Sequence, residues 1–122
     1  MTRTMKITVS NLTASSLVRT SHHLKHGKWT DGVEPTLIIK SKEKGFINSQ
    51  KQTGASFGAE GYCMYTIMDN GAHPTFEVSW SKPHNGKSFV KTSDTPEYMA
   101  TVETILDTTE HFEALVTVNG KT

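Results

Sequence analysis

The 122-residue sequence contains a single cysteine and no long apolar run. Cys63 therefore has no internal disulfide partner, and we expect it to be a small buried hydrophobic residue because it lies in the apolar stretch YCMYTI. No window approaches the ~18 apolar residues of a transmembrane helix. The start, MTRTMKITVSN, also lacks the apolar stretch of a signal peptide. We accordingly expect a soluble protein that is released without an evident signal peptide.

The sequence also has little excess charge of either sign. Lys and Arg number 13, Asp and Glu number 12, and the formal net charge is +1. Such a balance gives no field that would attract a nucleic-acid polyanion, so we expect no nucleic-acid partner. The length fits one core, and we predict a single domain over residues 1–122.

Alternating apolar residues predict strands along most of the chain. Met5, Ile7 and Val9 alternate with polar residues, as do Phe76 and Val78 in TFEVSW. We also predict strands in SLVRTS, residues 61–68, KSFVKTS, EYMATVETIL and HFEALVTVNG. EYMATVETIL contains good helix formers, but no N-cap or helical apolar stripe accompanies them. About eight or nine short strands with regular turns predict an all-β fold, an antiparallel β-sandwich.

Turn residues predict how these strands connect. TLIIKS and GFINS flank KEK as the arms of a hairpin, and Asn70-Gly71 predicts a tight type I′ turn before TFEVSW. The glycines and proline of HHLKHGKWTDGVEP predict a loop. Gly58 and Gly61 are expected to supply the positive φ angles of a turn at the start of the next strand.

Two chemistries are suggested by isolated residues and then excluded by their context. His22, His23 and His26 come nearest to a metal site, but no helical period brings them to one face, so we interpret them as solvated loop residues and predict no metal or other cofactor. Ser56 in GASFG resembles the Gly-x-Ser-x-Gly elbow of hydrolases. That elbow is a strand-to-helix turn, whereas a strand follows here, so we predict that the protein is not an enzyme.

The remaining candidates are aromatic residues and one carboxylate. Glu60 lies between glycines at the start of a predicted strand, with Tyr62 beside it and with Trp29 and Trp80 in other segments. Trp and Tyr suit boundaries between water and apolar media, and a carboxylate beside aromatic rings suits an ammonium group. Two plainer interpretations remain open. Alternation places Trp80 in the core, and Glu60 accepts N–H groups from its own turn.

The order of these segments resembles the aegerolysins, and most closely the small aegerolysin-like component of binary insecticidal crystal proteins. The resemblance is carried by VSNLT, LKHGKW, GASFGAEG, YCMYTI and FEVSWSKPHNGKSF, which extend over most of the chain. The sequence departs from the family pattern at Ser81 and Lys82, where Asp-Asn is usual, and at Ala59, where Thr is usual. It retains Glu60.

The resemblance implies a β-sandwich like that of aegerolysins and actinoporins, without enzymatic activity. It further implies the membrane-binding component of a two-component pore-forming, insecticidal toxin. The resemblance implies that the protein is secreted, or released from an intracellular inclusion of the producer cell. It is then expected to act at the target cell membrane with a larger partner protein. The lipid is expected to be a sphingolipid such as ceramide phosphoethanolamine. Trp29, Glu60 and Trp80 match the lipid-binding residues of the family, and we include Tyr62 and Lys82 in the predicted site.

Other interpretations of the same sequence remain. Exposed aromatic rings also stack on sugars, so a carbohydrate-binding or structural sandwich is the alternative function. Unpaired edge strands permit a homodimer. The histidines permit a pH-dependent assembly step, because an imidazole titrates near ~6.5.

Overall fold

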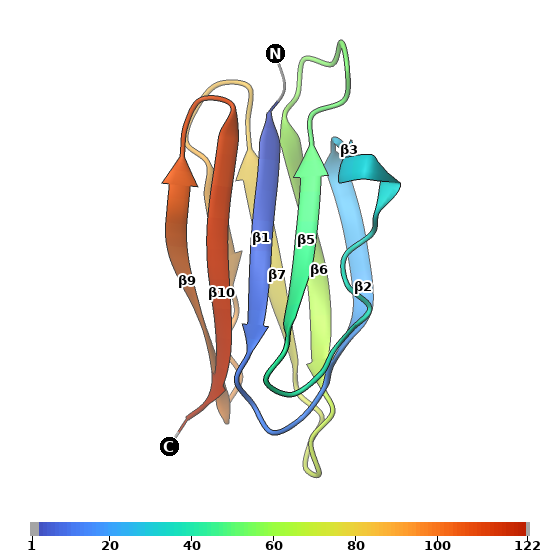
Figure 1. Ribbon diagram of the computed structural model, residues 1–122, viewed down its shortest axis with the longest axis vertical. Coiled ribbons are helices and arrows are strands. Elements are labelled where there is room, and N and C mark those ends of the chain that lie inside the picture. The colour runs from blue at the N-terminus through green and yellow to red at the C-terminus, as the bar shows by residue number, and fades with distance from the viewer. Residues whose placement is uncertain (1–2, 122) are drawn as a thin grey trace.

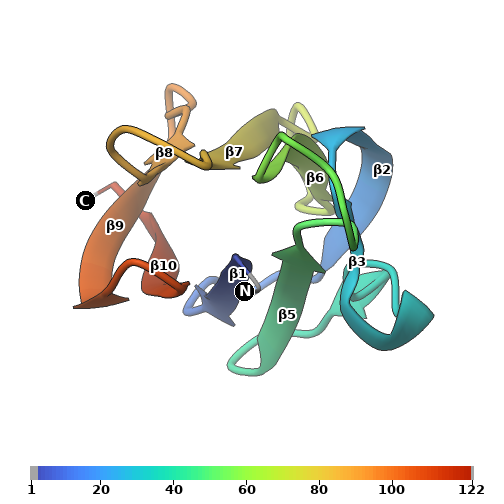
Figure 2. The ribbon, with the colours of Figure 1, turned by 90° about the horizontal axis from the view of Figure 1, so that it is seen from above.

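The computed structural model describes residues 3–121, so both ends of the predicted domain lie outside the described residues. Two five-stranded sheets pack face to face (Figure 1; Figure 2). Sheet A contains, in spatial order, β3 (Lys28–Trp29), β5 (Lys44–Gln50), β1 (Thr4–Asn11), β10 (His111–Gly120) and β9 (Tyr98–Asp107). Sheet B contains β4 (Ile38–Ile39), β2 (Leu17–His26), β6 (Ala59–Ile67), β7 (Thr75–Lys82) and β8 (Phe89–Thr92). The predicted all-β sandwich is confirmed.

The core lies between the sheets because every second residue of the central strands points inward. In β6, for example, Cys63 and Tyr65 are buried while Tyr62 and Met64 face outward. Cys63 is therefore the buried hydrophobic residue that the sequence predicted. The largest fully buried side chains are those of Trp80, Tyr65, Phe76, Met5 and Ile7. Besides the strands there is a three-residue 3₁₀ helix, η1 (Thr30–Gly32), and no helix in residues 3–121 is long and apolar enough to cross a membrane.

One strand pair departs from the antiparallel arrangement. β1 and β10 are parallel neighbours, with Thr4 opposite His111 at one end and Asn11 opposite Val118 at the other. The pairs β1–β5, β3–β5, β9–β10, β2–β4, β2–β6, β6–β7 and β7–β8 are all antiparallel. The first and last strands of the described chain therefore form the middle of sheet A.

The predicted loop HHLKHGKWTDGVEP is largely wrong. Its three histidines belong to β2, and β3 and η1 follow directly. β2 has register shifts between Arg19 and Ser21 and between Leu24 and His26. A β-bulge adds a residue to one strand and interrupts the alternation of inward and outward side chains. Because these two irregularities break the two-residue alternation of side chains, alternation did not predict the whole of β2.

The predicted hairpin of TLIIKS and GFINS is also wrong, because its two arms enter different sheets. β4 pairs with β2 in sheet B, whereas β5 pairs with β1 and β3 in sheet A. The connection crosses between the layers, and the two strands pack instead of pairing. A Cβ atom on Gly45 would lie 2.4 Å from Ile39 Cδ1, so the glycine permits this close approach.

The hairpin between β6 and β7 is present, but its turn is not of the predicted type. Neither Asn70 nor Gly71 has a positive φ, which a type I′ turn requires, and the positive φ lies at His73 (52°). Asp69 organises the loop instead. Its Oδ1 accepts hydrogen bonds from the backbone N–H groups of Gly71 at 3.0 Å and His73 at 3.1 Å.

Candidate functional site

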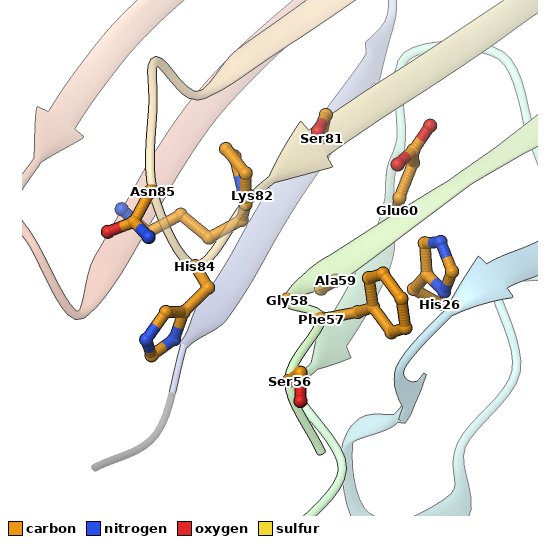
Figure 3. A pocket seen from close by; sticks show the side chains of 11 residues that line it. His26, Ser56, Phe57, Gly58, Ala59, Glu60, Ser81, Lys82, His84 and Asn85 are labelled. Atoms are coloured by element: carbon orange, nitrogen blue, oxygen red, sulfur yellow. The ribbon is translucent and has the colours of Figure 1, made fainter.

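The candidate site is a groove at one end of the sandwich, which we call the end groove. Here β2 and β7 terminate and β6 begins, at the top of Figure 1. The groove has a volume of about 420 Å³ and is lined by parts of the loops before β6 and after β7. His26, Phe57 and Glu60 lie along one wall, and Lys82, His84 and Asn85 lie along the other (Figure 3).

Glu60 is held with its side chain on the outer face of sheet B. Its neighbours Ala59 and Gly61 are buried, so alternation directs Glu60 outward. The side chain is 38% exposed, and its carboxylate lies 3.8 Å from Nζ of Lys25, which is itself 67% exposed. A solvent-exposed pair at this distance is weak. The described residues provide the Glu60 carboxylate with no hydrogen bond, so nothing in this structure supports the capping interpretation of Glu60.

The glycines around Glu60 serve close packing and not the expected turn. Positive φ angles occur at Gly27, Gly32, Gly54 and Gly86, whereas Gly58 and Gly61 do not have them. A Cβ atom on Gly58 would lie 1.7 Å from the carbonyl oxygen of Lys82, and one on Gly61 would lie 2.4 Å from that of His23. The two glycines thus let the start of β6 lie directly against β7 on one side and β2 on the other.

Trp29 and Trp80 lie inside the sandwich and not on the wall of the end groove. Trp80 is 1% exposed, as the alternation in β7 predicted. Trp29 is half-buried and packs against the core, with its ring centroid 6.0 Å from that of Trp80. Trp29 also lines a neighbouring hollow of about 550 Å³ together with Leu24 and Gln50. Trp80 borders a groove on the outer face of sheet B, but its indole is almost completely covered, so Trp29 is the indole that is more open to a ligand.

Lys82 is also buried, with an exposure of 4%. Its Nζ donates a hydrogen bond to the carbonyl oxygen of Thr108 at 2.6 Å and so ties β7 to the turn between β9 and β10. Desolvation lowers the pKa of Lys82, and the nearby Asp107 carboxylate opposes this shift. The side chain therefore holds this wall of the end groove in place, and its ammonium is engaged within the protein.

Tyr62 faces a second groove, on the outer face of sheet B, which we call the face groove. This groove has a volume of about 320 Å³ and is lined by His23, Glu60, Tyr62 and Phe89, among others. The rings of His23 and Tyr62 are 5.9 Å apart. Glu60 lines both grooves. The predicted site residues therefore do not converge on one point: Glu60 and Tyr62 share the outer face, Trp29 and Trp80 share the interior, and Lys82 supports the end groove from within.

Phe57 is a functional candidate that the sequence analysis missed. Its side chain is 60% exposed at the end of the molecule, and its ring stacks on His26 with centroids 4.2 Å apart and an interplanar angle of 8° (Figure 3). His26 lies opposite Glu60 in the pairing of β2 with β6. The available signal was an aromatic residue inside the polar, glycine-rich stretch GASFG, which the sequence interpretation related to a hydrolase elbow around Ser56 and to the family pattern but not to an exposed aromatic side chain.

The other candidate chemistries find no assembled site among residues 3–121. Ser56 lies in an irregular loop that leads into a strand, as predicted, and not at a strand-to-helix turn. No group of three or more His, Cys, Asp or Glu side chains in this part of the chain is arranged to hold a metal ion. His22 instead contacts Glu34 at 3.1 Å, and this contact lowers the pKa of Glu34.

Among the solved structures that share this architecture are the following three. RahU, crystallised in complex with a TRIS molecule, matches 98% of this chain and 96% of its own with a TM-score of 0.75 and 13% identity. IP-1A from Alcaligenes faecalis matches 98% of this chain and 92% of its own with a TM-score of 0.72 and 21% identity. The lipid binding protein Nakanori matches 95% of this chain and 70% of its own with a TM-score of 0.75 and 12% identity.

The chain therefore has the same fold as these proteins, a β-sandwich of the kind that the sequence resemblance to aegerolysins implied. At these identities the likeness establishes the fold and nothing further. No protein-family model matches the sequence, and no curated protein sequence matches it. Its function must therefore be argued from its own residues.

Proposed function

We propose that this protein binds a membrane lipid whose head group carries an ammonium, with Glu60 as the counter-charge. The observation that carries the proposal is the position of Glu60, whose half-exposed carboxylate lines both grooves and has only a long contact with Lys25. An ammonium beside a partly desolvated carboxylate and aromatic rings gains both charge pairing and cation–π attraction. Ceramide phosphoethanolamine, a sphingolipid, has such a head group.

The end groove supplies the other parts that a lipid head group needs. Phe57 is exposed beside Glu60 and offers apolar surface to the interfacial region of the bilayer. On the opposite wall His84 and Asn85 bring polar side chains that suit the phosphate (Figure 3). Trp29 and Tyr62 flank this site, in the neighbouring hollow and in the face groove. The similarity to a lipid binding protein supports this assignment.

The test is co-sedimentation of the protein with liposomes that contain or lack ceramide phosphoethanolamine. Glu60→Gln removes the charge and keeps the size of the side chain. Glu43→Gln is the matched control, because Glu43 is exposed in the connection between β4 and β5, remote from the end groove. We expect selective pelleting of the parent and of Glu43→Gln, and its loss in Glu60→Gln. Equal pelleting of all three proteins would contradict the role of Glu60.

We further propose that the chain is the membrane-binding component of a two-component, insecticidal pore-forming toxin. The order of its sequence motifs supports this proposal, which assigns the membrane-inserting part to a larger partner protein. The chain alone should then bind liposomes without releasing an encapsulated dye. Dye release by the purified chain at concentrations that saturate binding would show that it forms pores unaided, and the two-component proposal would fail.

A carbohydrate ligand is the second candidate, favoured by the face groove. This groove is lined by the rings of Tyr62, His23 and Phe89 and by the polar residues Glu77 and Ser79. Many sugar-binding sites likewise combine aromatic rings with polar side chains. Binding to a glycan array that a free sugar abolishes would support this function. If Tyr62→Ala abolished glycan binding and left liposome binding intact, sugar and lipid would occupy separate grooves.

A further inference from the structure

β9 forms one edge of sheet A and leaves part of its backbone without a partner. It pairs with β10 on one side, and residues 101–110 are all exposed. Near its start the other side is closed by the chain itself. The hydroxyl of Thr92 donates to the carbonyl oxygen of Ala100 at 2.8 Å, and the N–H of Ala100 donates to Oδ1 of Asp94 at 3.1 Å.

The contacts of Ala100 fix which groups point away from the sheet. Backbone N–H and C=O groups alternate in direction along a strand, so those of Val102 and Thr104 point outward like those of Ala100. No backbone or side-chain partner of these groups occurs in residues 3–121. Large apolar side chains surround them, with Val102 36%, Ile105 53% and Leu106 42% exposed. An unprotected edge of this kind is a template for another strand.

We propose that this edge pairs with the same edge of a second copy of the chain, in antiparallel orientation, with Val102 of each copy opposite Thr104 of the other. The two-fold axis then passes beside Glu103. Each of the two Val102–Thr104 pairs exchanges both of its backbone hydrogen bonds. An isologous contact closes on itself, so the product is a dimer and not a filament.

The structure selects this register among those that a two-fold axis allows. A shift that placed Thr104 opposite Ala100 would displace Thr92 and Asp94, which already occupy the outward groups of Ala100. A shift in the other direction would require pairing beyond Thr104, where the pairing with β10 changes register and Ile105 is the extra residue. Only the register centred on Glu103 uses both free residues of each copy and no others.

Two features predict that the dimer is weak and sensitive to charge. The free edge is short, which places the contact below the roughly 1,200 Å² that stable interfaces bury. The register also places the two Glu103 carboxylates opposite each other on the outer face, and like charges in directly opposed positions destabilise a strand pair. The proposal does not depend on the lipid function, because β9 contributes no residue to the wall of either groove.

The experiment is sedimentation equilibrium of the full chain from micromolar to millimolar concentration. The parent should show a reversible monomer–dimer equilibrium. Glu103→Gln should tighten the dimer by about two- to fivefold. Thr104→Pro removes an outward N–H from each copy and should weaken it by at least about tenfold. Thr104→Val, which keeps the N–H, is the matched control and should leave the equilibrium unchanged.

Amide hydrogen exchange gives a second readout that does not depend on any variant. With rising concentration, exchange of the Val102 and Thr104 amides should slow, while that of Glu103, which pairs with Leu115 in β10, should not change. A parent that stays monomeric at millimolar concentration would overturn the proposal. The proposal would also be overturned if the Glu103→Gln and Thr104→Pro variants both dimerised with the dissociation constant of the parent, because association would then use another surface.

Discussion

The indole rings of Trp29 and Trp80 contact each other across the sandwich, with centroids 6.0 Å apart and planes inclined by 55°. Trp29 belongs to β3 at the edge of sheet A, and Trp80 belongs to β7 within sheet B. The two residues that the family resemblance assigns to lipid thus link the two layers at the end of the molecule where lipid is proposed to bind. We therefore expect both residues to contribute to the stability of the fold, which can be measured as the free energy of unfolding.

Replacing Trp80 should cost far more stability than replacing Trp29. Trp80→Ala empties a fully buried site and should lower the free energy of unfolding by about 3–5 kcal/mol. Trp29→Ala removes a half-buried ring and should cost about 1–2 kcal/mol. Urea unfolding followed by circular dichroism measures both. A Trp80→Ala protein of parental stability that no longer bound lipid would instead show that Trp80 acts on the ligand.

Gly58→Ala should be strongly destabilising although the substitution adds one methyl group. The new Cβ would lie 1.7 Å from the carbonyl oxygen of Lys82, so the backbones of β6 and β7 must separate, which we expect to cost about 3 kcal/mol or more. Gly71→Ala is the control, because its Cβ would meet nothing closer than 3.7 Å. Thermal unfolding should separate the two variants clearly, and equal melting temperatures would contradict the close packing at Gly58.

Lys25→Met should strengthen lipid binding if Glu60 pairs with an ammonium. Lys25 Nζ lies 3.8 Å from the Glu60 carboxylate and competes with the head group for it. Removing a weak exposed pair should increase the affinity for ceramide phosphoethanolamine liposomes by about two- to fivefold. Lys28→Met, another exposed lysine of the same region, should have no such effect. A loss of affinity in Lys25→Met would mean that Lys25 itself contacts the lipid.

Phe57→Ala should reduce liposome binding by about tenfold, because an exposed aromatic ring is lost from the surface that meets the bilayer. The variant should fold normally, since the ring is largely exposed and stacks only on His26. Exposed Phe46, on sheet A outside both grooves, offers the control Phe46→Ala. Parental affinity in Phe57→Ala would remove Phe57 from the membrane-contacting surface.

Stability should fall in alkaline solution because of Cys63. Burial raises the pKa of its thiol from 9.0 to about 12, so between these values the unfolded chain releases a proton that the folded chain retains. The free energy of unfolding should therefore decrease as the pH rises through this range. Burial also raises the pKa of Tyr65, which acts in the same direction. Cys63→Ala should show a shallower decrease in urea unfolding at a series of alkaline pH values, and an identical slope would contradict the assignment.

Alternation predicted the strands that keep one face in the core over their whole length, and the sequence also predicted β9, although most of its residues are exposed. β1, β7 and β10 keep one face in the core in this way, and the sequence also places Cys63 and Trp80 correctly in the interior. β2 was recognised only at its start because its irregular register breaks the period. β4 and β5 were identified as extended but joined wrongly, since alternation specifies a face and not the sheet to which a strand belongs.

The candidate site was less predictable than the fold. Glu60 could be selected because a charge at the mouth of an apolar strand is unusual. Phe57 carried only the weak signal of an aromatic residue in a polar loop, and nothing in GASFG reveals that its ring stacks on His26. Lys82 is a charged residue whose burial depends on a carbonyl group 26 residues away. Contacts between segments distant in sequence decide these positions, and local patterns do not contain them.

The parallel pairing of β1 with β10 also constrains how the chain reaches its native state. Thr4 and His111 are 107 residues apart, yet they are paired with each other. Their strands, β1 and β10, lie side by side within sheet A (Figure 1). During synthesis on the ribosome, β1 emerges first and must wait for almost the whole chain before its central partner exists. Sheet A is therefore completed after translation of β10, and such non-local pairing makes folding slow. Until then the edge of β1 that pairs with β10 has no partner and is open to other strands. Newly made chains are therefore prone to mispair with one another at high concentration.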